Sequence, residues 1–296
     1  MKTVTSVSGG KTSAMMALEF PTDHYIFAVV LTDHKPSAPK DKGLLRECQN
    51  RIPWFVASHE ADLTLINMLR LEQEIGKRID WVASQYSLDR YLAKDTDLVG
   101  YRSNTIASKV PLDAIVEKKK MLPNAQHRFC TEETKLKPMF WQCYLNYFDG
   151  ETPLLMNVGF RWDEPRRVES WTCDKDKFKF PKSCSLTGRK QQQHSLIEWR
   201  VTQFPMYEHG ISKLDVAKYW LDKGWQFPEI SNCRFCFHHR DIEQQRQAEL
   251  EPDNLQWWLE QEEKTGHTFG KRSLKNIIAQ PLLDVYGDRE PCHCTD

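Results

Sequence analysis

The sequence predicts an α/β protein with a doubly wound parallel sheet. Up to about residue 205, short apolar runs that are typical of buried strands alternate with stretches whose apolar residues have helical spacing. The clearest βαβ unit opens the chain, where residues 3–7 and 25–31 resemble strands and the segment between them resembles a helix. Ligands bind at the carboxyl ends of the strands in such sheets, so residues that follow a strand are the candidates for function.

The other elements follow in chain order. Strands are predicted at 54–57, 79–83 and 154–160, and helices at 44–51, 62–77 and from about 137 to 147. Beyond 205 the alternation stops, and helical patterns cover 211–223, 243–266 and 273–279. We therefore expect an α/β domain over residues 1–205 and a helical, cysteine-bearing subdomain over residues 206–296.

Composition limits the classes of function. The chain has 296 residues, with 41 Lys and Arg balanced by 41 Asp and Glu, so no overall field attracts a polyanion. A local basic groove would still be enough to bind nucleic acid. No run of about 18 apolar residues is present, and the N-terminus lacks the apolar segment of a signal peptide. We expect a cytoplasmic, soluble protein with no membrane partner.

The first candidate site follows the first strand and reads Ser8-Gly9-Gly10-Lys11-Thr12-Ser13. It resembles a Walker A loop, but that loop needs its first glycine at position 5, where this chain has Thr5. A strand, a glycine pair, a hydroxyl-rich turn and a helix still form an anion site, because free N–H groups and the helix dipole point at a bound phosphate. The alternative is a glycine-rich turn that binds nothing.

Nine cysteines are the second notable feature. Structural disulfides are not expected in the cytosol, so metal, cluster or thiol chemistry is the leading explanation for some of them. Cys48 and Cys143 lie in amphipathic helical patterns and are interpreted as small buried apolar residues. Cys233 and Cys236 have the two-residue spacing that presents two sulfurs to one metal centre, although a chance spacing is the alternative. The candidates for the missing ligands are Cys130, Cys292, Cys294, His238 and His239.

Four stretches occur in a characteristic order: SGGKTS at 8–13, HRFCTEETKLKP at 127–138, GFRWDEPRR at 159–167 and NCRFCFHH at 232–239. Together they resemble the phosphoadenosine phosphosulfate reductase family of the PP-loop, or adenine nucleotide α-hydrolase, superfamily, including its phage-type and DNA-thiolation relatives. The resemblance covers most of the chain. It implies that the glycine loop holds the terminal pyrophosphate of ATP and exposes the α-phosphate, so that the enzyme adenylates its substrate.

The resemblance also implies roles for single residues. Arg128, Cys130, Lys135 and Lys137 would lie beside the nucleotide. Gly159 and Arg161, with Arg166 or Arg167, would contact the phosphates, while Cys233 and Cys236 would help to hold an iron–sulfur cluster. Residue chemistry supports the phosphate role, because arginine binds phosphate oxygens bidentately. The alternative is that these arginines pair with Asp163 and Glu164. Asp33, after the second strand, could bind ribose or adenine or simply cap a turn.

The chain departs from the reductases in two places. Phe129-Cys130 stands where cluster-bearing reductases have two adjacent cysteines, and the tail EPCHCTD lacks the Glu-Cys-Gly-[Leu/Ile]-His sequence that carries their redox-active cysteine. We therefore expect adenylation with release of pyrophosphate, followed by sulfur transfer to a nucleic acid or a nucleotide. Mg²⁺ would neutralise the pyrophosphate, and a sulfur donor or partner protein could take part.

The expected catalytic residues are Lys11, Cys130, Arg161 and Cys294, and the expected 4Fe–4S ligands are Cys130, Cys233, Cys236 and Cys292. A structural zinc on Cys233, Cys236, Cys292 and either Cys294 or a histidine is the alternative metal site. Two other functions remain open. One is a sulfonucleotide reductase that needs no ATP, and the other is a nucleotide-binding accessory subunit that holds zinc.

Overall fold

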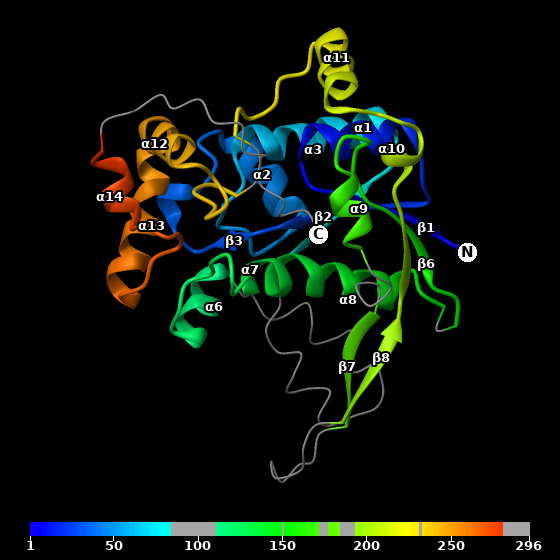
Figure 1. The fold of residues 1–296 in the computed structure, drawn as a ribbon, viewed down its shortest axis with the longest axis horizontal. Coiled ribbons are helices and arrows are strands. Elements are labelled where there is room, and N and C mark those ends of the chain that lie inside the picture. Colours follow the sequence, from blue (N-terminus) through cyan, green and yellow to red (C-terminus); the bar gives the residue numbers. More distant parts are fainter. Residues whose placement is uncertain (84–110, 150, 172–176, 184–192, 231–232, 281–296) are drawn as a thin grey trace.

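The computed structural model describes residues 1–83, 111–149, 151–171, 177–183, 193–230 and 233–280 (Figure 1). Its centre is a five-stranded sheet in which all neighbouring strands are parallel. In spatial order the strands are β5 (Ile79–Ala83), β2 (His24–Val29), β1 (Thr3–Val7), β6 (Leu154–Asn157) and β9 (Arg200–Gln203). The predicted parallel α/β sheet is confirmed.

Helices cover both faces of this sheet, and Figure 1 shows α1 and α3 on one side and α8 on the other. On β2, Tyr25, Phe27 and Val29 pack into the core beneath α1 (Lys11–Glu19), α2 (Lys42–Arg51) and α3 (Asp62–Ile75). Ile26 and Ala28 pack into the opposite core, beneath α8 (Lys137–Asn146). Because successive strand residues point to opposite faces, a continuously apolar run such as 25–29 suits a strand that is buried on both sides.

The order of the strands creates a switch point between β1 and β6. From β1 the chain builds outward through β2 to β5, and then returns to place β6 and β9 on the other side of β1. The connections on the two sides of β1 therefore lead in opposite directions at the carboxyl ends of β1 and β6. Open α/β sheets bind their ligands at such a switch point.

The remaining described elements are short or lie outside the sheet. They are β3 (Leu31–Thr32), the 3₁₀ turn η1 (Lys35–Ser37), β4 (Ala57–Ser58), α6 (Leu112–Lys119), α7 (Phe129–Thr131), the π-helical segment η2 (Glu132–Leu136), α9 (Pro165–Glu169), β7 (Lys177–Ser183), β8 (Gln193–Glu198), α10 (Pro205–Glu208), α11 (Lys213–Lys223), α12 (Asp241–Leu250), α13 (Pro252–Thr265) and α14 (Leu274–Ile278). No helix in the described part of the chain is long and apolar enough to cross a bilayer.

Four local predictions were wrong or incomplete. Of the strand expected at 54–57, only Ala57 is extended; with Ser58 it forms β4, which pairs antiparallel with β3 outside the main sheet. The helix expected over 243–266 is two helices, because the second begins with Pro252, which cannot donate a hydrogen bond to the preceding turn. The helix expected from about 137 begins at Phe129 and continues through η2 into α8. The hairpin β7–β8 was not predicted.

Helices beyond residue 205 contribute to the cores on both sides of the predicted boundary. Val216 and Trp220 of α11 pack with α1, and the Trp220 indole donates a 2.8 Å hydrogen bond to the carbonyl of Lys11. Trp257 and Trp258 of α13 pack in a third cluster with Leu112 of α6. The helical predictions for 211–223 and 273–279 are confirmed, with Ser212 and Ser273 as N-caps, while the domain boundary at 205 stays a prediction.

Candidate functional site

The glycine loop after β1 has a conformation that needs glycine at one position. Gly9 has φ +82°, and a Cβ at Gly9 would lie 2.3 Å from Cγ2 of Thr64 in the first turn of α3. Ser13 closes the loop, since its hydroxyl accepts a 3.0 Å hydrogen bond from the Ser8 N–H and donates to the Gly10 carbonyl at 3.2 Å. The predicted turn is therefore a compact loop, held from within and packed against α3.

The loop ends at the amino end of α1, which has no side-chain cap and no acidic residue in its first turn. The first amides of a helix have no partner within the helix, and the helix dipole favours an anion there. Lys11, at the first position of α1, has an exposed side chain. These features suit a bound phosphate group.

The loop after β6 lies against the same turn. A Cβ at Gly159 would lie 3.5 Å from the backbone of Ser13, which is an ordinary contact, so crowding alone does not require glycine there. Arg161, two residues further on, donates from Nη1 to Oγ1 of Thr12 at 3.3 Å. The structure thus joins two predicted phosphate-binding segments that lie almost 150 positions apart in the sequence, and it does so at the switch point of the sheet.

The structure shows the alternative interpretation for Arg161, which pairs with acidic neighbours, while its contact with phosphate stays a prediction. Its guanidinium lies 3.0 Å from Asp163 and 3.4 Å from Glu164, and the same Glu164 carboxylate lies 2.9 Å from Arg167. The two carboxylates neutralise part of the positive charge of Arg161. They also hold its guanidinium beside Thr12, so the side chain would not need to be ordered when a ligand binds. Fixed orientation of this kind lowers the entropic cost of binding a ligand.

Asp33 follows β2 and β3, and β2 flanks β1 on the side opposite β6. The side chain of Asp33 is exposed. Its N–H donates to Oδ2 of Asp113 at 3.2 Å, and Oδ1 of Asp113 accepts a 2.6 Å hydrogen bond from the indole of Trp257. The sequence alone did not indicate Asp113, which ties α13 to the backbone beyond β3.

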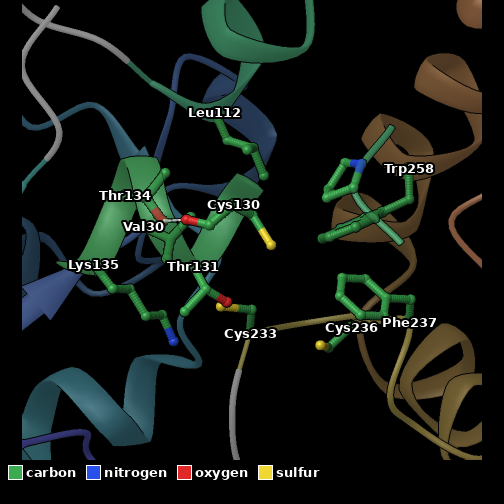
Figure 2. Close-up of a pocket in the computed structure, with 11 residues that line it drawn as sticks. Val30, Leu112, Cys130, Thr131, Thr134, Lys135, Cys233, Cys236, Phe237 and Trp258 are labelled. Carbon is green, nitrogen blue, oxygen red and sulfur yellow. Dashed lines mark hydrogen bonds between the residues drawn. The ribbon is translucent and has the colours of Figure 1, made fainter. Parts of the chain in front are cut away.

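Three of the four cysteines predicted to bind the cluster line one pocket (Figure 2). Cys130, Cys233 and Cys236 all line it, and the pocket holds about 400 Å³ of empty space, open solvent included. Its other lining residues are Val30, Leu112, Pro123, Thr131, Thr134, Lys135, Phe237 and Trp258. The pocket borders the carboxyl end of β2, next to β1, so the thiols and the glycine loop lie at the same edge of the sheet.

The loop that carries Cys233 and Cys236 is anchored by the residues between them. Arg234 is buried, and its backbone N–H donates to the carbonyl of His59 at 2.7 Å. Phe235 has φ +52°, which is uncommon for a residue with a side chain, and its N–H donates to Gln247 at 2.7 Å. Strained positions of this kind cluster at functional sites.

Cys130 comes from the first turn of the helix that begins at Phe129. Its carbonyl accepts a 2.6 Å hydrogen bond from the Thr134 hydroxyl, where the π-helical segment η2 widens the helix. Single π-helical turns occur frequently at functional sites. Thr134 and Lys135 both lie in this segment and line the pocket beside Cys130.

One acidic residue that sequence reasoning missed contacts these thiols. Glu60 is buried, and the Cys233 thiol donates to its Oε1 at 3.7 Å. Burial raises the pKa of Glu60, while the nearby positive charge of Lys135 acts in the opposite direction. No motif distinguishes Glu60, because its position depends on the turn between β4 and α3.

The geometry fits the predicted cluster only in part. Among the described residues no group of three or more His, Cys, Asp or Glu side chains is arranged to hold a metal ion. Cys292 and Cys294 lie outside the described residues, so the proposed fourth ligand and the proposed tail thiol have no placement. The interpretation of Cys48 and Cys143 as buried residues is confirmed, and burial raises the pKa of both thiols.

Comparison with known proteins gives no independent guide, since no protein-family model and no curated protein matches the chain. The chemistry of the site is therefore inferred from its own residues and their geometry.

A buried histidine beside the thiol pocket predicts a measurable pH dependence of stability. Burial, with the charge of Arg234, lowers the pKa of His59 to about 3 from a usual value of 6.5, and its Nε2 has no hydrogen-bond partner among the described residues. Between these pH values the unfolded chain binds a proton that the folded protein does not, so stability falls as the pH falls from 6.5 towards 3.

The measurement is urea unfolding from pH 6 to pH 4 for the wild type and His59→Phe. The wild type should lose about 1.4 kcal/mol per pH unit more than the variant, because one proton is involved. Carboxylates titrate in both proteins and cancel in the difference. Equal slopes would show that His59 takes up its proton in the folded state.

Proposed function

We propose that this chain is a PP-loop enzyme that binds ATP through residues 8–13 and exposes the α-phosphate to a nucleophile, with pyrophosphate as the leaving group. We further propose that the reaction serves sulfur transfer to a nucleic acid or a nucleotide. One observation carries most of the weight: Arg161, from the loop after β6, contacts Thr12 of the glycine loop at the switch point of the sheet.

The residues would share the work as follows. The amides at the start of α1 and the glycine loop hold the β- and γ-phosphates, and Lys11 adds a positive charge there. Arg161 stabilises negative charge that develops as pyrophosphate leaves, because its fork of donors matches phosphate oxygens. Mg²⁺ would supply further neutralisation of the leaving pyrophosphate.

We also propose that Cys130, Cys233 and Cys236 hold a 4Fe–4S cluster together with Cys292, and that this cluster would supply a labile iron for holding or relaying sulfur. The support is their shared pocket, the strained and anchored loop at Phe235, and a spacing that suits two sulfurs on one centre. Zinc on Cys233 and Cys236 is the alternative. Cys294 would act as a thiolate nucleophile beside the cluster, and Cys130 would take that role only if it is not a ligand of the cluster.

The test of the reaction is to identify its products. With ATP and an acceptor the enzyme should release AMP and pyrophosphate. Arg161→Ala should lower turnover about 100-fold while weakening ATP binding less than tenfold, because the contact strengthens as charge develops. The matched control is Arg246→Ala, which removes a surface arginine paired with Glu229 at 2.9 Å and should change neither value.

Other products would support other functions. Release of ADP and phosphate, with turnover unchanged in Arg161→Ala, would show that the loop acts as a Walker loop and would contradict the proposal. Formation of adenosine 3′,5′-bisphosphate from phosphoadenosine phosphosulfate and a thiol donor would support the reductase instead.

Metal analysis separates the cluster from zinc. Protein that is purified without oxygen should be brown and contain iron and sulfide, and Cys233→Ala or Cys236→Ala should lower the content of both by more than half. Cys48→Ala is the control, since this thiol is buried in the core beneath α1, α2 and α3. A colourless wild type with one zinc per chain would contradict the cluster and favour the accessory subunit.

A further inference from the structure

One tryptophan differs from all the others. The chain has ten tryptophans, all within the described residues, and only the ring of Trp162 is largely exposed, at 56%. Trp162 directly follows Arg161 in the loop after β6, so its backbone adjoins the residue that contacts Thr12 of the candidate phosphate site. A single exposed apolar residue needs no explanation, but a large planar ring beside a phosphate site is the kind of surface that a nucleobase recognises.

The ring is mounted on a rigid support. The backbone N–H of Trp162 donates to the carbonyl of Ile211 at 2.9 Å, and the neighbouring Asp163 carboxylate accepts from the backbone N–H of Lys213 at 3.1 Å. Tyr207 packs beside the indole, with ring centroids 5.2 Å apart and planes tilted by 37°. The loop after β6 is therefore tied to the segment after β9, and a ligand that stacks on Trp162 would not have to order it.

The two segments that support this ring carry exposed cations. Arg166 of α9 follows Trp162 and Lys213 follows Ile211; both side chains are exposed, and neither forms an ion pair with another described residue. Four acidic groups of these segments are already engaged: Asp163 and Glu164 with Arg161 and Arg167, Glu208 with the Phe204 N–H, and Asp215 with Ser212, while Glu169 at the end of α9 is exposed. Exposed aromatic rings combined with unpaired Lys and Arg are typical of proteins that bind single-stranded nucleic acid.

We propose that Trp162 is a stacking platform for an unpaired base of a single-stranded nucleic acid, and that this strand is the acceptor of the reaction. The second half of this statement rests on the proposed function, while the first does not. A free nucleotide would instead be expected in a pocket that buries most of its surface. An open ring on segments that carry separate exposed cations suits a polymer whose backbone crosses the surface.

The test compares two labelled oligonucleotides about 12 nucleotides long, one of thymidines and one abasic, by fluorescence anisotropy. The wild type should bind the thymidine strand about tenfold more tightly than the abasic strand, because only the former can stack. Trp162→Ala should remove this difference, whereas Trp162→Phe should retain most of it. Leu221→Ala is the control, since this residue is 80% exposed on α11 and should leave the difference unchanged.

The experiment separates a failure of base stacking on Trp162 from a failure of the proposed adenylation. Affinity for ATP is measured on the same proteins, and Trp162→Ala should leave it unchanged. Loss of ATP binding in the Trp162→Ala variant would assign the ring to the base of ATP and overturn the proposal. Equal affinity of the wild type for both strands would also overturn it, whatever the result with ATP. Base-dependent binding by a protein that fails to bind ATP would keep Trp162 as a platform and refute only the adenylation step.

Discussion

Gly9→Val is expected to weaken ATP binding at least about 100-fold. Gly9 has φ +82°, where a β-branched residue is strained, and any Cβ there would lie 2.3 Å from Cγ2 of Thr64. The loop would have to move away from α3, and its amides would no longer converge on one phosphate. Titration calorimetry with ATP measures the loss, and circular dichroism checks that the fold persists.

Gly76→Val is the matched control for this prediction. Gly76 also has a positive φ, +67°, but a Cβ there meets no atom within 4 Å. The variant should be less stable through backbone strain yet bind ATP like the wild type. A second comparison isolates the clash with Thr64. Because Thr64→Ser removes Cγ2, adding it to Gly9→Ala should partly restore the ATP binding that Gly9→Ala alone loses. Equal ATP affinity in Gly9→Val and the wild type would exclude residues 8–13 as the binding loop.

Arg234→Ala is expected to lower the free energy of unfolding by about 3 kcal/mol. The Arg234 side chain is buried, donates to the Ser58 carbonyl at 3.0 Å, and pairs with Asp62 at 3.2 Å and with Glu251. Its removal leaves two carboxylates without their counter-charge and a buried carbonyl without its donor. The change also removes one anchor of the loop between Cys233 and Cys236, so the metal content expected of the proposed thiol site should fall with it.

Urea unfolding measures this effect, and Arg272→Ala is the control. Arg272 pairs with Asp241 on the surface, where both side chains are about half exposed, so its loss should cost less than about 1 kcal/mol. If Arg234→Ala were as mild as Arg272→Ala, Arg234 would not be the anchor of the loop.

Periodicity predicted most of the sheet and its helices, because burial on two faces requires continuous apolar runs such as 25–29, and burial on one face requires helical spacing such as that in 62–75. It failed where other forces decide. The strand β7 was missed although Lys177–Phe180 alternates lysine with phenylalanine, because this period-two pattern is only four residues long and Pro181 interrupts it. Pro252 divides a helical pattern that looked continuous.

Motifs in the sequence identified the candidate site residues. They could not identify several of the residues that contact those candidates in the fold. Thr64, Glu60 and Asp113 belong to no motif, and each gains its role from a neighbour far away in the sequence: Gly9, Cys233 and Asp33 respectively. Their side chains are ordinary for helix starts and turns. Only the folded chain shows which ones face the loop or the thiols.

The sequence by itself determined the class of fold and the list of candidate chemical groups, because apolar spacing and residue type are local properties that can be read along the chain. The tertiary structure alone decided how these groups combine. It brought Arg161 to Thr12 by returning the chain across β1, gathered Cys130, Cys233 and Cys236 around one pocket, and left one tryptophan of ten in solvent. Such relations depend on strand order and on packing between distant segments, which no local pattern records.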